Sequence, residues 1–179
     1  MKVLFLDRDG VVNEEVNYLY RTEDFRFARN ALIGIKAFVA LGYQIAIVTN
    51  QAGIARGYYT EEDYRKLTEF YLKKLEAHGV PILTVAHCPH HPEGVVEKYS
   101  YECDCRKPKP GMIDDIVNEW NVNKAESIMV GDKLSDIEAG LRAGIENCFL
   151  VETGHDLPHN LAQEIRVCND LIEVSELCR

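Results

Sequence analysis

The chain has 179 residues, 46% of them apolar and 27% charged, which is the balance of a globular protein with a sizeable core. Its formal net charge is −9, whereas a nucleic-acid-binding face is basic, so we expect no nucleic-acid partner. No apolar run approaches the ~20 residues that span a bilayer, so we expect no membrane association.

The start of the chain, MKVLFLDRDG, holds a short apolar run that meets Asp7 almost at once. This run is too short for the apolar core of a secretory signal, so it predicts a strand and a cytoplasmic protein. In a reducing compartment, six cysteines are not expected to form a disulfide framework. We interpret Cys148, Cys168 and Cys178 as buried or incidental thiols, because they lack a paired spacing.

Strand and helix patterns alternate along the chain. Apolar runs that close on polar residues predict strands at 2–7, 44–50, 82–88, 127–132 and 147–153, with helices at 31–41, 60–78, 111–120 and 135–143. Thr60 to Asp63 form a candidate capping box, and Gly42, Gly79 and Gly144 lie just past three of the helices. The alternation predicts one α/β domain over 1–179, a three-layer, Rossmann-like parallel sheet with helices on both faces. The stretch from His155 onward shows no specific pattern.

Polar groups follow the predicted strands at their carboxyl ends, where ligands bind in such sheets. These groups are Asp7-Arg8-Asp9-Gly10, Thr49-Asn50-Gln51, Lys107, and Gly131-Asp132-Lys133 with Asp136 one turn later. Taken singly, Asp132 suits a helix cap or turn, Thr49 an ordinary strand end and Lys107 a solvated cation. Taken together, the carboxylates, the hydroxyl and the lysine indicate a site for Mg²⁺ and a phosphoryl group.

The segments DRDG, TN, the lysine of RKP and GDKxxD resemble the four motifs of the haloacid dehalogenase (HAD) superfamily of phosphatases. The resemblance implies that Asp7 attacks phosphorus to form an aspartyl-phosphate and that Asp9 is the general acid and base. It also implies that Mg²⁺ binds the Asp7 carboxylate, the Asp9 backbone carbonyl and the Asp132 carboxylate, with Asp136 in support. Thr49 and Lys107 would hold phosphoryl oxygens. The intervals after Asp9 and Asn50 are too short for a cap domain, so we expect a capless enzyme.

The segment 88–105 carries two close pairs of metal ligands. Cys88-x-His90 is followed after twelve residues by Cys103-x-Cys105, and three thiolates with one imidazole suit a structural, tetrahedral Zn²⁺. His91 could replace His90, and His87 fits a strand end better. A redox CxC pair and incidental thiols are the alternatives. Because this segment has too little apolar content to fold alone, zinc would order it and fix the Arg106, Lys107 and Lys109 that follow.

Within the superfamily, zinc-loop members resemble two groups, the histidinol-phosphate phosphatases and the D-glycero-D-manno-heptose-1,7-bisphosphate 7-phosphatases. The segments DRDGVVNEEVNYLY, TNQAGIARGYYT, CPHHPEG, CDCRKPKPGM and MVGDKLSDI resemble the heptose group. That resemblance implies hydrolysis of the 7-phosphate in a pathway that feeds lipopolysaccharide or other surface glycans. It also implies substrate contacts at Glu15, Val16, Asn17, Tyr18, Thr49, Asn50, Gln51, Ala52, Arg106, Lys107 and Lys133.

Two alternatives stay open beside the heptose enzyme. One is a histidinol-phosphate phosphatase, which typically has a shorter zinc loop and lacks the segment IARG. The other is a zinc-stabilised binding module without catalysis, which the presence of both Asp7 and Asp9 disfavours. In either enzyme reading, the partner is a small phosphorylated molecule, and we expect a monomer.

Overall fold

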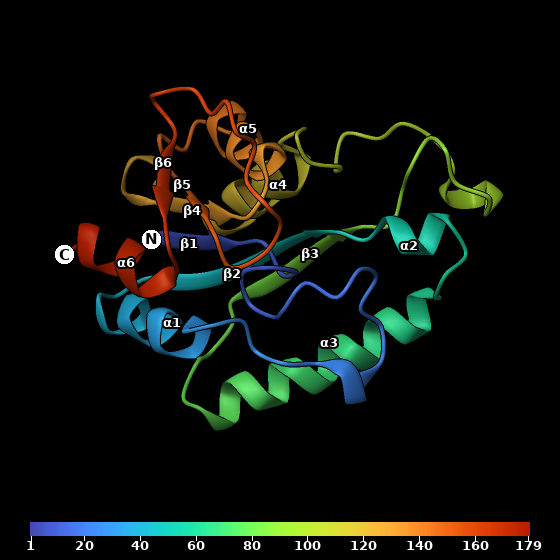
Figure 1. Ribbon diagram of the computed structural model, residues 1–179, viewed down its shortest axis with the longest axis horizontal. Coiled ribbons are helices and arrows are strands. Elements are labelled where there is room, and N and C mark those ends of the chain that lie inside the picture. The colour runs from blue at the N-terminus through green and yellow to red at the C-terminus, as the bar shows by residue number, and fades with distance from the viewer.

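A six-stranded, wholly parallel sheet forms the centre of the computed structural model, which describes residues 1–179 (Figure 1). The strand order is β3-β2-β1-β4-β5-β6, so β1 lies in the middle, with β2 and β4 on either side. Phe5 of β1 pairs with Ala46 of β2 and with Met129 of β4. The parallel sheet predicted from the sequence is therefore confirmed. The strands are β1 (Val3–Leu6), β2 (Gln44–Asn50), β3 (Thr84–Cys88), β4 (Ile128–Gly131), β5 (Asn147–Val151) and β6 (Arg166–Cys168).

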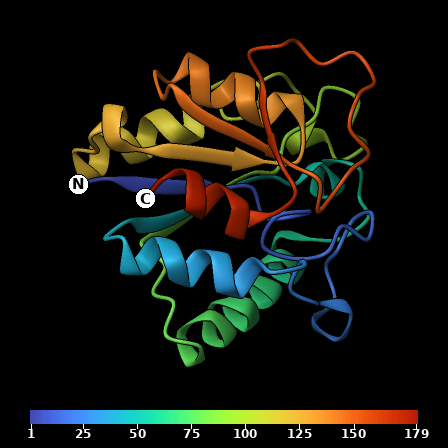
Figure 2. The ribbon, with the colours of Figure 1, turned by 60° about the vertical axis from the view of Figure 1, so that its left-hand side comes forward.

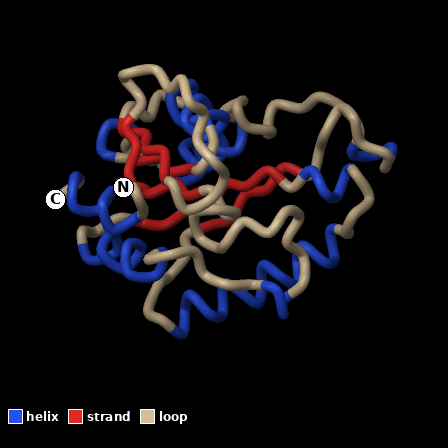
Figure 3. Tube along the Cα trace, viewed as in Figure 1, coloured by secondary structure: helices blue, strands red, loops and turns tan.

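Helices cover both faces of the sheet because successive strand residues point to opposite sides. Leu4 and Leu6 pack into one apolar cluster, whereas Val3 and Phe5 pack into a second cluster on the other face. In Figures 1 and 3, α1 and α3 lie below the sheet and α4 and α5 lie above it. The helix α6 lies at the left and packs into the same cluster as α1 and α3. The helices are α1 (Ala31–Ala40), α2 (Ala52–Ala55), α3 (Glu61–Ala77), α4 (Gly111–Trp120), α5 (Leu134–Arg142) and α6 (Leu171–Leu177), with short 3-10 turns η1 (Thr22–Asp24), η2 (Glu97–Tyr99) and η3 (Lys124–Glu126).

The ends of α3 show why the helix pattern could be read from the sequence. Thr60 Oγ1 accepts a hydrogen bond from the Asp63 N–H at 3.1 Å, and Asp63 Oδ2 accepts one from the Thr60 N–H at 2.9 Å. This reciprocal capping box satisfies two backbone donors that the first turn leaves free. Gly79, just past the helix, has φ +76°, a left-handed conformation that glycine adopts without steric cost. Both predicted end signals are confirmed.

Three elements were missed by the sequence analysis: α2, β6 and α6. The strand β6 has three residues, two of them exposed at the sheet edge, so it carries no apolar run. The helix α6 is seven residues long, but Asp170 caps it by accepting hydrogen bonds from Ile172 N–H at 2.9 Å and Glu173 N–H at 3.2 Å. An Asp three residues before a Glu is a start signal that could have identified this helix.

The carboxyl ends of the strands lie at one edge of the sheet, and loops cover that edge. In Figure 2, the strand arrows point toward the side where the long loops gather, and both termini lie at the opposite side. The segment between β1 and α1 holds only η1, and the segment between β2 and α3 holds only α2. Loops therefore take the place of a cap, as the sequence predicted. None of the helices combines the length and the apolar character that crossing a membrane demands.

Candidate active site

A cavity of about 430 Å³ opens at the carboxyl edge of the sheet. This volume is in the range of small-molecule sites. Residues from the ends of β1 and β2, the segment 88–108, the start of α5 and the loop after β5 converge on it, although they are far apart in sequence. The lining residues are Asp7, Asp9, Glu15, Asn17, Tyr18, Asn50, Gln51, Ala52, Arg56, Tyr59, His91, Arg106, Lys107, Pro108, Lys133, Ser135, Asp136 and His155.

Asp7 and Lys107 form a buried ion pair at the floor of this cavity. Lys107 Nζ lies 2.8 Å from Asp7 Oδ1 and 2.6 Å from Asp136 Oδ1, and it donates to the Val48 carbonyl at 2.7 Å. Burial raises the pKa of Asp7, and the Lys107 ammonium opposes that rise. Burial acts to lower the pKa of Lys107, but Asp136 and Asp7 outweigh it and hold that pKa above its ordinary value. Lys107 therefore keeps its positive charge, and its ammonium group is held in one position.

Three buried carboxylates surround this one cation, which leaves the cluster with excess negative charge. Oxygens of Asp7, Asp132 and Asp136 lie within 4.8 Å of one another. Oδ1 of Asp132 is buried and has no hydrogen-bond partner, whereas Oδ2 accepts from the His155 backbone N–H at 2.9 Å and contacts His155 Nδ1 at 2.6 Å. An unpartnered buried carboxylate oxygen costs free energy unless something binds it. A hard divalent cation such as Mg²⁺ fits this donor set and its charge.

Glycines leave the space in which the Asp132 carboxylate lies. A Cβ on Gly10 or on Gly154 would overlap that carboxylate, and Gly10 also has φ +84°. Thr153 fixes the same loop, because its hydroxyl donates to the Gly10 carbonyl at 2.6 Å. The loop after β5 therefore closes directly over Asp132.

Asp136 has both carboxylate oxygens engaged by the protein. One contacts Lys107 Nζ, and the other accepts from the Lys133 backbone N–H at 3.0 Å. This arrangement fits the supporting role that the sequence analysis expected for Asp136, although the metal ligands themselves stay predictions. Gly131 is required beside it, since a Cβ there would overlap the Asp136 side chain.

Asp9 is held in one orientation by three side chains. Arg8 Nη2 lies 2.9 Å from Oδ1 and 3.0 Å from Oδ2, Asn13 Nδ2 donates to Oδ1 at 2.9 Å, and Gln51 Nε2 donates to Oδ2 at 3.2 Å. Arg8 is only 1% exposed. Burial acts against its charge, but the Asp9 carboxylate outweighs burial and raises the pKa of Arg8. These contacts fix the position and the orientation of the Asp9 carboxylate.

Asn50 binds the backbone that carries Lys107. Its Nδ2 donates to the Lys107 carbonyl and its Oδ1 accepts from the Lys107 N–H, both at 3.0 Å. This pair of bonds joins the end of β2 to the end of the zinc loop. Asn50 lines the cavity, as expected, but its amide is committed to placing Lys107.

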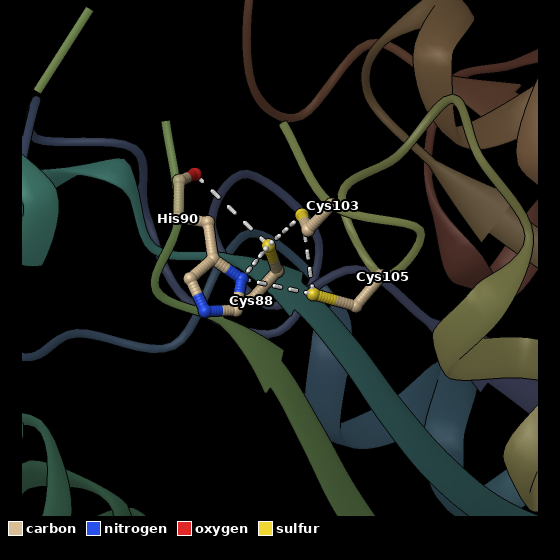
Figure 4. A group of neighbouring side chains, drawn as sticks. All are labelled: Cys88, His90, Cys103 and Cys105. Atoms are coloured by element: carbon tan, nitrogen blue, oxygen red, sulfur yellow. Dashed lines mark hydrogen bonds between the residues drawn. The ribbon is translucent and has the colours of Figure 1, made fainter. Parts of the chain in front are cut away.

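Cys88, His90, Cys103 and Cys105 form a compact cluster (Figure 4). Cys103 Sγ lies 3.4 Å from both Cys88 Sγ and Cys105 Sγ, and His90 Nδ1 lies 3.3 Å from Cys105 Sγ and 3.6 Å from Cys88 Sγ. These separations are near the ~3.8 Å edge of a tetrahedron whose centre is ~2.3 Å from each sulfur. The four residues are therefore compatible with the zinc site that their spacing predicted.

His90, not its neighbour His91, belongs to this cluster. The Tyr101 hydroxyl lies 2.7 Å from His90 Nε2, which fixes the ring and turns Nδ1 toward the sulfurs. His91 points elsewhere, with Nε2 3.4 Å from Arg56 Nη2 and Nδ1 accepting from the Glu93 N–H. The alternative in which His91 replaces His90 is therefore not supported by the geometry.

The wall of the cavity nearest the cluster of Cys88, His90, Cys103 and Cys105 is cationic. Arg106 follows Cys105, His91 follows His90, and Arg56 ends α2. Burial lowers the pKa of His91, and the neighbouring Arg106 and Arg56 guanidinium groups lower it further. Buried atoms Arg56 Nε and Arg106 Nη1 have no partner within the protein. Two arginines with unused donors make this wall suited to an anion.

The predicted substrate loop 15–18 lies partly at the cavity. Glu15, Asn17 and Tyr18 line it, whereas the Val16 side chain is exposed at the molecular surface and lies outside the lining. Asn17 and Tyr18 have φ of 56° and 66°, a left-handed pair that is rare for residues other than glycine. Tyr18 packs edge-on against Tyr58 with ring centroids 4.6 Å apart. The unusual backbone turns Tyr18 toward the pocket.

Several lining residues were not found by sequence analysis. Arg56, Tyr59, His91 and Ser135 lie in segments that resemble the heptose group, but no feature of the sequence placed their side chains in the cavity, and His155 lies in a stretch with no specific pattern. Their placement depends on tertiary packing, such as the zinc loop lying against α2, where the Val95 and Val96 N–H groups donate to the Ala55 carbonyl at 2.8 and 2.9 Å.

Comparisons with known proteins agree with this architecture. Residues 104–174 match the model of the HAD-hydrolase-like family. The chain is 51% identical over 177 residues to a D-glycero-alpha-D-manno-heptose-1,7-bisphosphate 7-phosphatase of Photorhabdus laumondii, covering 99% of this chain and 96% of that one. It is 39% identical to a D-glycero-beta-D-manno-heptose-1,7-bisphosphate 7-phosphatase of Escherichia coli, covering 84% and 79% of the two chains.

Solved structures show the same fold. A D,D-heptose 1,7-bisphosphate phosphatase from B. bronchiseptica, complexed with magnesium and phosphate, superposes with a TM-score of 0.83 at 31% identity, covering 99% of this chain and 97% of that one. A HAD-like phosphatase from Mesorhizobium loti gives a TM-score of 0.86, also at 31% identity, with 99% and 87% covered. From its fold, its buried acidic centre and these likenesses, the chain belongs to the HAD-like phosphatases, in the family of the heptose-bisphosphate 7-phosphatases.

Proposed function

We propose that this protein removes the 7-phosphate of D-glycero-D-manno-heptose 1,7-bisphosphate in a Mg²⁺-dependent reaction that passes through an aspartyl-phosphate. The observation that carries the proposal is that cationic side chains line one cavity in two places, each of which suits a phosphate. Asp7 and Lys107 lie at its floor, and Arg56, His91 and Arg106 lie along one wall. Thr49 is buried and does not itself line the cavity, but its hydroxyl accepts a hydrogen bond from the lining residue Gln51. A monophosphate would use only the place at the floor.

Asp7 acts as the nucleophile. Its carboxylate is fixed by Lys107 and is only 7% exposed, so few water molecules compete for it. In the first step, an Asp7 oxygen bonds to phosphorus while the bond from phosphorus to the substrate oxygen breaks. Lys107 and Thr49 bind the other phosphoryl oxygens, on which charge is spread in the transition state.

Asp9 moves the protons. It gives a proton to the departing sugar oxygen and then takes one from the water that hydrolyses the aspartyl-phosphate. Its three side-chain partners hold it beside Asp7 throughout both steps. The outcome is inorganic phosphate and regenerated Asp7.

Asp7 and Asp132 would hold the Mg²⁺, which supplies positive charge to the phosphoryl oxygens when bound. The support from this chain is the unpartnered Asp132 Oδ1 and the three clustered carboxylates. The Asp9 backbone carbonyl is the third expected protein ligand. We likewise propose Zn²⁺ at Cys88, His90, Cys103 and Cys105, as a structural ion that holds Arg106 and Lys107 in place.

The relatives differ in the anomer that their names state. The P. laumondii relative named for the alpha anomer is 51% identical to this chain, whereas a second P. laumondii relative, named for the beta anomer, is 41% identical. We therefore propose the alpha anomer as the preferred substrate. Phosphate release from both anomers, at equal concentrations, tests this preference directly.

A phosphate-release screen tests the function itself. Purified protein with Mg²⁺ is assayed on heptose 1,7-bisphosphate, histidinol phosphate, fructose 1,6-bisphosphate and p-nitrophenyl phosphate. We expect the highest kcat/KM on the heptose bisphosphate. Higher kcat/KM on histidinol phosphate would favour the histidinol-phosphate reading, and no release from any ester would favour a non-catalytic zinc-stabilised module.

The setting of the reaction completes the proposal. We place it in the cytoplasm, where a reducing environment keeps the three cysteines of the proposed zinc site from oxidation. The product, a heptose 1-phosphate, would feed nucleotide-heptose synthesis for lipopolysaccharide or other surface glycans. We propose that residues 1–179 act as one domain and as a monomer.

A further inference from the structure

The side-chain amide of Gln51 joins two groups of the reaction centre. Its Nε2 donates to Thr49 Oγ1 at 2.8 Å and to Asp9 Oδ2 at 3.2 Å, while its Oε1 accepts a hydrogen bond from the Tyr59 hydroxyl. Gln51 is 2% exposed and Tyr59 is 6% exposed. The Gln51 backbone N–H is also used, since it donates to the Cys88 carbonyl at 2.8 Å. Gln51 therefore has no polar donor left for a substrate.

The Tyr59 hydroxyl decides which way the Gln51 amide faces. Once Asp9 has given its proton to the leaving group, its carboxylate can only accept hydrogen bonds, so the NH₂ end of the amide must face it. If the amide turned over, its carbonyl oxygen would face the Asp9 carboxylate and leave buried groups unpaired. A donor at Oε1 prevents this. Because burial raises the pKa of Tyr59, its hydroxyl keeps its proton and stays a donor.

The orientation of the amide has consequences for both catalytic groups. Thr49 has a single hydroxyl hydrogen, and because its oxygen accepts from Gln51, that hydrogen is free for a phosphoryl oxygen. Asp9 accepts a hydrogen bond from Gln51 on Oδ2 and one from Asn13 on Oδ1, and the two bonds fix the rotation of the carboxylate. One amide thus aligns both the phosphoryl ligand and the proton donor.

The ring of Tyr59 is held in place independently of its hydroxyl. A Cβ on Gly53 would overlap the Tyr59 ring, so the glycine provides the space in which the ring packs. Tyr20 also stacks on the Tyr59 ring, with centroids 5.5 Å apart and an interplanar angle of 10°. A phenylalanine at position 59 can therefore keep the packing and lose only the hydroxyl.

We propose that Tyr59 and Gln51 are positioning residues, in which the Tyr59 hydroxyl orients the Gln51 amide and the amide aligns Asp9 for proton transfer and Thr49 for phosphoryl binding. The inference rests on the proposed phosphatase activity, but it does not require the heptose substrate.

The test compares Tyr59→Phe with a matched control, Tyr71→Phe. Tyr71 is fully buried in the large apolar cluster, outside the small cluster that holds Tyr59, and its hydroxyl has no hydrogen-bond partner, so its removal leaves no group unpaired. The kcat/KM is measured on p-nitrophenyl phosphate and on a sugar phosphate. The first substrate leaves as a weak base that needs little proton donation, whereas the second depends on Asp9. We expect Tyr59→Phe to lower kcat/KM on the sugar phosphate about ten-fold more than on p-nitrophenyl phosphate.

A second variant keeps the test independent of folding problems in the first. Gln51→Met removes both amide N–H donors and should show the same selective loss of kcat/KM. Adding Tyr59→Phe to Gln51→Met should lower kcat/KM little further, because the hydroxyl acts only through the amide. Equal losses on both substrates, additive effects, or a Tyr59→Phe variant that behaves like Tyr71→Phe would overturn the inference. Wild-type hydrolysis of p-nitrophenyl phosphate with Mg²⁺ reports on the proposed function separately.

Discussion

His155 binds one oxygen of Asp132 twice and leaves the other free. Its backbone N–H and its imidazole Nδ1 both lie within hydrogen-bond distance of Oδ2, at 2.9 and 2.6 Å, and Oδ1 is buried without a partner. The side chain of His155 is 40% exposed and Asp132 is buried. The loop after β5, which had no recognised motif, thus orients the carboxylate that is expected to bind the metal.

Replacing this imidazole should weaken metal binding more than it weakens the fold. For His155→Ala we expect about ten-fold lower affinity for Mg²⁺, because residues that orient a metal ligand typically contribute this much. The backbone N–H remains, which limits the loss. Binding is measured calorimetrically with Mg²⁺, or by the paramagnetic resonance of Mn²⁺, without substrate. The exposed His159→Ala is the control, and unchanged affinity in His155→Ala would refute the role.

Replacing Lys107 and replacing its neighbour Arg106 should change the kinetics in different ways. Lys107→Ala removes the cation beside Asp7 and should lower kcat on every substrate. Arg106→Ala should chiefly raise KM for the bisphosphate, by about ten-fold, because Arg106 lies on the wall proposed for the phosphate that does not react. Lys109→Ala, whose side chain is 44% exposed, is the control. If Arg106→Ala slows a simple monoester as severely as the bisphosphate, Arg106 belongs to the reacting end.

Part of the candidate site could be predicted from the sequence and part could not. Asp7, Thr49, Lys107 and Asp132 lie at strand and loop ends whose convergence follows from a parallel sheet, so their meeting could be foreseen. The partners of Asn50 could not, because its bonds to the Lys107 backbone depend on how the zinc loop folds back over β2. The fold followed from apolar periodicity, except where elements were as short as β6.

The zinc cluster should be needed for stability and, through Lys107, for catalysis. We expect about one Zn²⁺ per chain by elemental analysis of protein purified without chelator. Cys103→Ser should lose the metal; a loss of about 3 kcal/mol would lower the melting temperature by roughly 6–12 °C in a chain of this size. It should also reduce kcat. Cys178→Ser, outside the cluster, is the control. Zinc-free protein with wild-type activity and melting temperature would rule out this role.

The central claim concerns which phosphate leaves and which residue attacks it. The most direct measurement follows the reaction on heptose 1,7-bisphosphate by ³¹P NMR, with wild-type protein and with Asp7→Asn, which keeps the side-chain shape but removes the attacking charge. The account predicts that wild-type protein with Mg²⁺ converts the 7-phosphate signal to inorganic phosphate, that the 1-phosphate signal persists, and that folded Asp7→Asn releases nothing above background. Loss of the 1-phosphate first, or turnover by clean Asp7→Asn, would contradict it.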